Sequence, residues 1–141
     1  MRYVLLFLAL IGALDSGFAL REHYRTGASP CSINERWDCG VVNHSPYAVI
    51  AGVPVADIGI AGYLLLAFLA FRRQYRLMLA AAVPAVAFSL YLAHIEDSVL
   101  GVWCVYCAIS LGLICLLAIL VLGTVIFHGF RRDRTPAALH G

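Results

Sequence analysis

The sequence contains no lysine and few charged residues of any kind. All ten basic residues are arginine, and charged residues make up 13% of the 141 residues, against roughly 25% in soluble domains. Without lysine the chain has neither the lysine of a nucleotide-binding phosphate loop nor a Schiff-base lysine. A net charge of +2 gives no basis for binding nucleic acid.

Apolar residues, by contrast, are abundant. They make up 62% of the chain, and the mean hydropathy is +0.88. Ten basic and eight acidic side chains cannot cover the surface of a water-soluble domain of this size. We therefore expect the chain to fold in a lipid bilayer.

Four apolar stretches are long enough, or nearly so, to cross a hydrocarbon core of about 30 Å as helices. They are Tyr3–Leu20, Pro54–Phe71, Leu77–Ile95 and Trp103–Phe127. The sequence thus predicts an all-α integral membrane protein, a single four-helix transmembrane domain over 1–130 with a short cytoplasmic tail over 131–141. A cleaved signal peptide is the alternative for the first stretch, because Arg2 precedes it.

The arginines predict the orientation of these spans. Seven of the ten lie at the N-terminus, in the second connection and in the tail, and the third connection carries only Glu96 and Asp97. The positive-inside rule then places both termini in the cytoplasm. The long first loop faces outward, into a periplasm or an organelle lumen, where disulfides form.

Five cysteines are the main chemical asset of the chain. Cys31 and Cys39 lie in the outward loop. Cys104 and Cys107 form a CxxC at the outer start of the last span, and Cys115 lies deeper in that span. Within a helix Cys104 and Cys107 would share a face, with Cys107 about 4.5 Å deeper. A helix N-terminus favours the thiolate, so we expect this CxxC to be reactive and Cys115 to pack as a small apolar residue.

Two structural roles for the cysteines remain open. A Cys31–Cys39 disulfide would close a nine-residue loop, which the chain-entropy treatment values at about 2.5 kcal/mol. A zinc site of four thiolates is the other, but seven residues separate the loop cysteines, more than the usual two to four. An oxidising compartment also opposes it, so we expect no metal.

The cysteine pairs occur in a fixed order with other residues: Ser45 six positions after Cys39, Gly59 and Tyr63 in the second stretch, and Tyr91-Leu92-Ala93 in the third. This ordered set resembles the vitamin K epoxide reductase family, and the likeness extends from residue 3 to about 127. The resemblance implies a four-helix membrane enzyme that passes electrons between protein thiols and a quinone.

The resemblance also implies a role for each cysteine of the two pairs. Cys31 and Cys39 would form a shuttle pair that meets a thioredoxin-like partner. Cys104 would exchange with Cys39, and Cys107 would face the quinone. The depths agree with this division, because a quinone arrives through lipid and a soluble thiol protein arrives from water. We expect the partner to be a separate protein.

Three positions are assigned to the quinone pocket by the resemblance. Ser45 matches a serine beside that pocket, and Val55 and Leu111 stand where vertebrate members have an asparagine and a tyrosine. These two departures predict a bacterial-type member of the inner membrane, with its cysteine pairs on the periplasmic side and with ubiquinone or menaquinone as the quinone.

Local sequence signals add three expectations. Ser45-Pro46 predicts an N-cap and first helical residue, opening a short lid helix over Tyr47–Ala51 in the outward loop, with an ordinary interfacial helix as the alternative. Asp57 either hydrogen-bonds a quinone or stabilises a helix N-terminus. The stretches Gly12–Gly17 and Gly59–Gly62 are expected to allow close helix packing.

Another class of function remains open at this point. A non-catalytic membrane scaffold, with structural disulfides in its outer loop and a role in partner binding, would carry the same cysteines. An unrelated bacterial thiol oxidase that uses quinone is also a four-helix bundle, but its CxxC lies in the opposite half of the chain. Redox cycling of the cysteines would separate an enzyme from a scaffold, because structural disulfides resist reduction at the glutathione potential.

Overall fold

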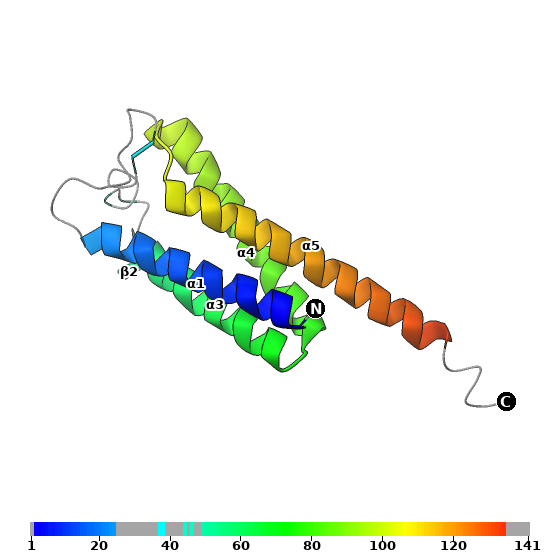
Figure 1. Ribbon diagram of the computed structural model, residues 1–141. Coiled ribbons are helices and arrows are strands. Elements are labelled where there is room, and N and C mark those ends of the chain that lie inside the picture. Colours follow the sequence, from blue (N-terminus) through cyan, green and yellow to red (C-terminus); the bar gives the residue numbers. More distant parts are fainter. Residues whose placement is uncertain (1, 25–36, 39–43, 45, 47–48, 135–141) are drawn as a thin grey trace.

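Four long helices form a bundle in the computed structural model (Figure 1). The structure describes residues 2–24, 37–38, 44, 46 and 49–134. The helices are α1 (Arg2–Tyr24), α3 (Val55–Phe71), α4 (Tyr75–Ile95) and α5 (Val105–Arg134). The prediction of an all-α membrane bundle is confirmed.

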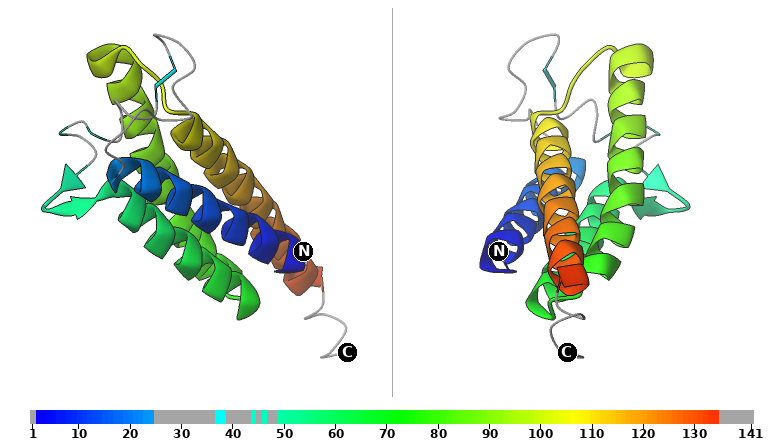
Figure 2. Two further views of the ribbon diagram at one scale, coloured as in Figure 1. Left: turned by 60° about the vertical axis from the view of Figure 1, so that its left-hand side comes forward. Right: turned by 90° about the vertical axis from the view of Figure 1, so that its right-hand side faces the viewer.

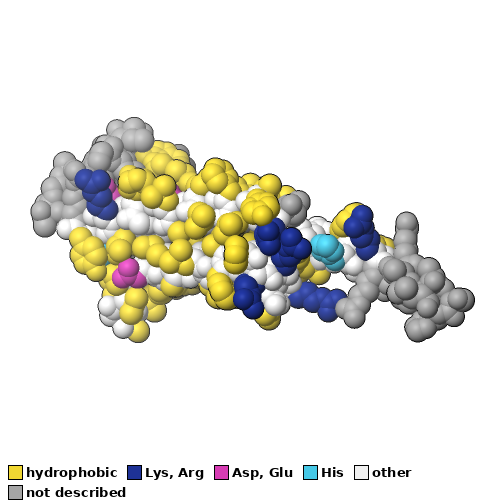
Figure 3. Space-filling model, turned by 60° about the horizontal axis from the view of Figure 1, so that its bottom comes forward, with side chains coloured by type: hydrophobic (Ala, Val, Ile, Leu, Met, Phe, Trp, Pro, Cys, Tyr) yellow, Lys and Arg dark blue, Asp and Glu magenta, His cyan; other side chains and the backbone are white. Residues whose placement is uncertain are grey.

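Three elements of the described chain are long and apolar enough to cross a membrane. They are Arg2–Tyr24, Tyr75–Leu100 and Val105–Arg131. Helix α3 has 17 residues and is about 25 Å long. Large apolar side chains cover the outside of the bundle (Figure 3). A surface of this kind is expected where the surrounding solvent is lipid.

The two ends of the bundle differ in charge. Basic side chains gather at the end that holds the start of α1, the α3–α4 turn and the C-terminal part of α5 (Figure 3). We call it the arginine end, and its residues are Arg2, Arg72, Arg73, Arg76 and Arg131. The opposite end holds the start of α5 and its CxxC, and we call it the cysteine end.

A dense core fills the half of the bundle toward the arginine end. Side chains from all four helices meet there, and the fully buried ones are Leu5, Ala9, Ala70, Met78, Ala82, Leu117 and Val121. Several are alanines, and small residues let helices approach closely in a membrane, where packing and not the exclusion of water drives association.

Helices α1 and α3 pack closely along each other because glycine removes a side chain at two contacts. A Cβ on Gly12 would overlap the Tyr63 ring, and one on Gly59 would lie 2.7 Å from the Ser16 hydroxyl. These two glycines confirm the expected close packing. A Cβ on Gly17 or on Gly62 would meet nothing within 4 Å, so those two glycines make no such contact.

The segment before α3 is a β-hairpin that projects from the side of the bundle (Figure 2). Strand β1 (Val49–Ile50) pairs antiparallel with β2 (Val53–Pro54). The turn residues Ala51 and Gly52 both have positive φ, 53° and 82°, as two-residue hairpin turns require. The prediction of a lid helix over Tyr47–Ala51 is therefore wrong for its described part, because β-branched residues flanking a glycine turn favour paired strands.

We predict that Gly12→Ala destabilises the protein. Alanine in a helix interior is worth up to about 1 kcal/mol over glycine, but its Cβ would strike the Tyr63 ring, and overpacking costs about 1–3 kcal/mol. Thermal unfolding in detergent should therefore occur at a lower temperature than in the wild type.

Gly17→Ala is the matched control in the same helix, because its Cβ meets only open space. It should unfold at or above the wild-type temperature. A Gly12→Ala protein as stable as Gly17→Ala would contradict the close α1–α3 contact.

Candidate functional site

The CxxC lies at the N-terminus of α5. The helix begins at Val105, so Cys104 precedes it, and the Cys104 carbonyl accepts a hydrogen bond from the Ala108 N–H at 3.0 Å. Cys104 is thus the N-cap residue and Cys107 lies in the first turn. The predicted span began at Trp103, two residues earlier, but that residue forms an isolated β-bridge and cannot also be helical.

The CxxC thiols differ in access. Cys104 is fully buried among Leu100, Val102 and Tyr106. Cys107 is half-buried, and its thiol faces a cavity inside the bundle. Cys115, also half-buried, lies two turns farther along α5 and does not line that cavity. The CxxC therefore has one enclosed sulfur and one that a molecule in the cavity can reach.

A buried carboxylate contacts both cysteines. Glu96 is 3% exposed, and its Oε2 accepts a hydrogen bond from the Cys104 N–H at 3.3 Å. Its side chain also interacts electrostatically with the Cys107 thiol, which lines the same cavity. Glu96 begins η2 (Glu96–Leu100), a π-helical turn that continues α4 and ends at Gly101, whose φ is 69°. Such π turns are frequent at functional sites.

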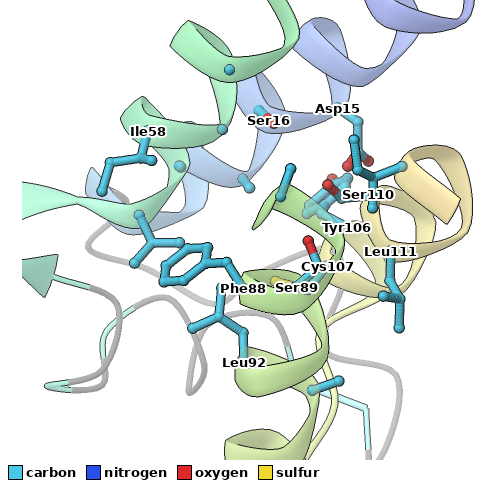
Figure 4. A pocket seen from close by; sticks show the side chains of 18 of the residues that line it. Asp15, Ser16, Ile58, Phe88, Ser89, Leu92, Tyr106, Cys107, Ser110 and Leu111 are labelled. Carbon is cyan, nitrogen blue, oxygen red and sulfur yellow. The ribbon is translucent and has the colours of Figure 1, made fainter. Parts of the chain in front are cut away.

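The cavity lies between all four helices toward the cysteine end, and its volume is about 380 Å³ (Figure 4). That size lies in the range of small-molecule sites. Its walls are mostly apolar and include Ile58, Phe88 and Leu92. Val55 and Leu111 also line it, so the structure brings these two predicted pocket positions together with Cys107.

A few polar groups interrupt the apolar walls. The Tyr63 hydroxyl donates to the Ser110 carbonyl at 2.8 Å and lies 2.9 Å from the Ser110 hydroxyl. Asp15 is 7% exposed, and its Oδ2 has no hydrogen-bond partner among the described residues. Figure 4 shows the Asp15 carboxylate on the same side of the cavity as Ser110. The cavity therefore contains an uncommitted acidic oxygen.

The described part of the outward loop docks directly on the approach to the CxxC. Trp37 and Trp103 form a parallel β-bridge, and the Asp38 N–H donates to the Trp103 carbonyl at 2.9 Å. The two indole rings lie 6.2 Å apart between centroids. The next residues in the chain are Cys39 after Asp38 and Cys104 after Trp103. Two distant segments that each lead into a cysteine are thus held together.

Residues 3–122 match the family model described as "Vitamin K epoxide reductase family". The chain belongs to the vitamin K epoxide reductase family. As a member of it, the protein is a membrane thiol oxidoreductase linked to a quinone. Among curated proteins, no match to the sequence was found.

The remaining predicted site residues of this vitamin K epoxide reductase family member have different outcomes. Cys31, Cys39 and Ser45 lie outside the described residues. Asp57 lies in the first turn of α3 and does not line the cavity, which favours its role at a helix N-terminus. The described residues include no group of three or more His, Cys, Asp or Glu side chains that could hold a metal ion.

From the sequence, Glu96 is one of several polar residues toward the outer side and has no assigned contact with a cysteine. The helix is interrupted at Gly101, between Glu96 and the CxxC, so helical spacing cannot relate them. One signal was available, since an acidic residue at the end of an apolar span is a functional candidate by default.

We predict that Tyr63→Phe lowers stability. The change removes the hydroxyl group that joins α3 to Ser110 of α5, and a hydrogen bond of this kind contributes about 0.5–1.5 kcal/mol. Denaturant unfolding in detergent should show this loss.

Tyr91→Phe is the matched control, because Tyr91 is 57% exposed on the outside of α4. Its unfolding free energy should equal that of the wild type. Equal effects of the two substitutions would show that the Tyr63 hydroxyl does not stabilise the bundle.

Proposed function

We propose that this protein is a bacterial-type, quinone-dependent thiol:disulfide oxidoreductase that oxidises a separate thioredoxin-like partner and so supports disulfide formation. One observation carries the proposal: the Cys107 thiol faces a small-molecule cavity with apolar walls, in a family whose chemistry links thiols to quinones. The acceptor is ubiquinone or menaquinone, and no metal takes part.

The electrons pass through two cysteine pairs. A thiolate of the reduced partner attacks the Cys31–Cys39 disulfide, and exchange through a mixed disulfide leaves the partner oxidised. Cys39 then exchanges with Cys104, which leaves the CxxC reduced. The CxxC gives two electrons and two protons to the quinone, so the net products are a partner disulfide and a quinol.

The docking of the outward loop supports the step between the two pairs. The Asp38–Trp103 hydrogen bond joins the residues that directly precede Cys39 and Cys104. Consecutive Cα atoms are about 3.8 Å apart, and each cysteine directly follows a residue of this hydrogen bond. The bond therefore favours disulfide exchange between Cys39 and Cys104. Disulfide exchange needs such proximity, since one thiolate must attack the other pair directly.

The cavity supports a quinone as the small substrate. Its apolar walls suit a ring and its isoprenoid chain, whereas Val55 and Leu111 offer no hydrogen bond to a carbonyl oxygen. The uncommitted Asp15 Oδ2 and the Tyr63–Ser110 pair are the polar groups available to that oxygen. Ser45 is assigned to the same pocket on the family resemblance.

The charge difference between the two ends supports the orientation. The arginine end faces the cytoplasm by the positive-inside rule, and the cysteine end faces the periplasm. A bacterial inner membrane is the location that gives the loop pair both an oxidising compartment and access to soluble thiol proteins.

We predict that Cys107→Ser abolishes quinone reduction. A serine hydroxyl cannot be oxidised to a disulfide, so the CxxC could no longer deliver two electrons. The measurement is optical quinone reduction by purified protein with a reduced thioredoxin-like substrate. Cys115→Ser is the control and should keep most of the turnover, because Cys115 does not line the cavity.

Both variants need to be compared at equal folded protein, since a buried serine can also lower stability. Quinone turnover near the wild-type rate in Cys107→Ser would refute the proposed function. Complete loss in a well-folded Cys115→Ser would move the quinone-facing role to that cysteine.

We predict that Cys39→Ser traps the partner. In this variant the Cys31 thiolate can still attack the disulfide of the oxidised partner and form a mixed disulfide, but the Cys39 thiol that would resolve it is missing. In cells the variant should accumulate covalent partner complexes, visible on a non-reducing gel and lost on reduction. Full turnover without any trapped complex would remove the shuttle role from the loop pair and favour a structural disulfide there.

A further inference from the structure

Glu96 is a buried acid whose polar contacts are with the reacting cysteines. Its side chain is 3% exposed, in a protein whose solvent is lipid. Its carboxylate accepts a hydrogen bond from the Cys104 N–H, and it lines the same cavity as Cys107. A buried carboxyl group is costly, so it persists where its chemistry is used or its bonds offset the cost.

Oxidation of the CxxC requires a proton acceptor at this place. Two thiols lose two protons and two electrons when they form a disulfide, and the thiolate is the species that reacts. The walls of the cavity that Cys107 faces are mostly apolar. A proton acceptor must lie near the group it serves, and Glu96 is held beside the CxxC by the Cys104 N–H and lines the same cavity wall as Cys107.

We propose that Glu96 is a catalytic residue that takes the proton from the Cys107 thiol and delivers it to an oxygen of the reduced quinone. The inference rests on the proposed function and deepens it. Glu96 itself lines the cavity beside Cys107, so the acceptor of the thiol proton also faces the bound substrate. No other residue is needed between thiol and substrate for this proton.

The step balances in atoms and electrons. The S–H bonds of Cys104 and Cys107 break, and one S–S bond forms between the sulfurs. The quinone takes up the two electrons. One quinol oxygen receives the Cys107 proton through Glu96, the other receives the proton of Cys104, and Glu96 returns to its carboxylate form for the next turnover.

A purely structural role for Glu96 is the competing explanation. Its carboxylate accepts the N–H of Cys104, next to the start of α5, and an acidic group there stabilises a helix N-terminus. Glu96→Gln separates the two roles, because the amide oxygen can still accept that N–H bond but the amide cannot accept a proton.

The test follows quinone reduction by pre-reduced protein in single-turnover mode for Glu96→Gln, Glu96→Asp and Asp97→Asn. Asp97 is the next residue and is exposed, so Asp97→Asn removes an equal charge beside the site and is the matched control. Thermal unfolding is recorded for each variant, and steady-state assays give kcat and KM.

We expect Glu96→Gln to lower kcat about 100-fold with KM within about twofold of the wild type, as loss of general acid–base catalysis does. Glu96→Asp keeps a carboxylate, so its kcat should be at least about 10-fold higher than that of Glu96→Gln. Asp97→Asn should have the kcat and KM of the wild type. Should Glu96→Gln fail to fold, Glu96→Asp decides alone: a drop in kcat at unchanged KM and unfolding temperature supports proton transfer.

Three results would overturn the inference. The first is a wild-type kcat in folded Glu96→Gln, and the second is an equal loss of kcat in Glu96→Gln and Glu96→Asp that follows their unfolding temperatures. The third is a loss of kcat in Asp97→Asn equal to that in Glu96→Gln. The proposed function fails by a different result, the absence of quinone turnover in the wild type, and the inference falls with it.

Discussion

The absence of water in the bilayer is the constraint on which the rest of this structure depends. Backbone groups must be satisfied inside helices, and a polar side chain needs a protein partner. In the described chain most arginines lie at one end, with Arg21 as the exception, and the reactive groups lie at the other end. Several of the polar side chains kept inside, among them Glu96, Asp15 and Tyr63, line one cavity, whereas the buried Glu22 and Thr124 do not. Lipid as a solvent therefore concentrates the chemistry at one place.

Packing explains why the cavity lies where it does. Near the arginine end, small residues let the helices touch, and at the middle of α1 Gly12 packs against the Tyr63 ring. Toward the cysteine end the helices leave a space of about 380 Å³ between them. The closely packed half holds the helices in register, so that Cys107 from α5 and Glu96 from η2 both line that space.

Much of the site was predictable because it depends on residue type and order. The four apolar stretches became four helices, and the CxxC came to the start of the last one, because composition and length determine membrane spans. The lid helix was wrong because a two-residue turn at Ala51 and Gly52 lets the flanking residues pair as strands. The N-cap and proline signals that predicted a helix carry no information about pairing between the two strands.

The sequence by itself determined the solvent, the number of helices and the reactive groups, since apolar length, charge distribution and cysteine spacing act locally along the chain. Only the tertiary structure decided which groups meet. Glu96 reaches Cys104 and Cys107 through a π turn and a positive-φ glycine, and Trp37 pairs with Trp103 across 66 positions of sequence. These contacts depend on how the helices and the loop are placed relative to one another. That placement arises from packing between segments, and no sequence pattern within a single segment encodes it.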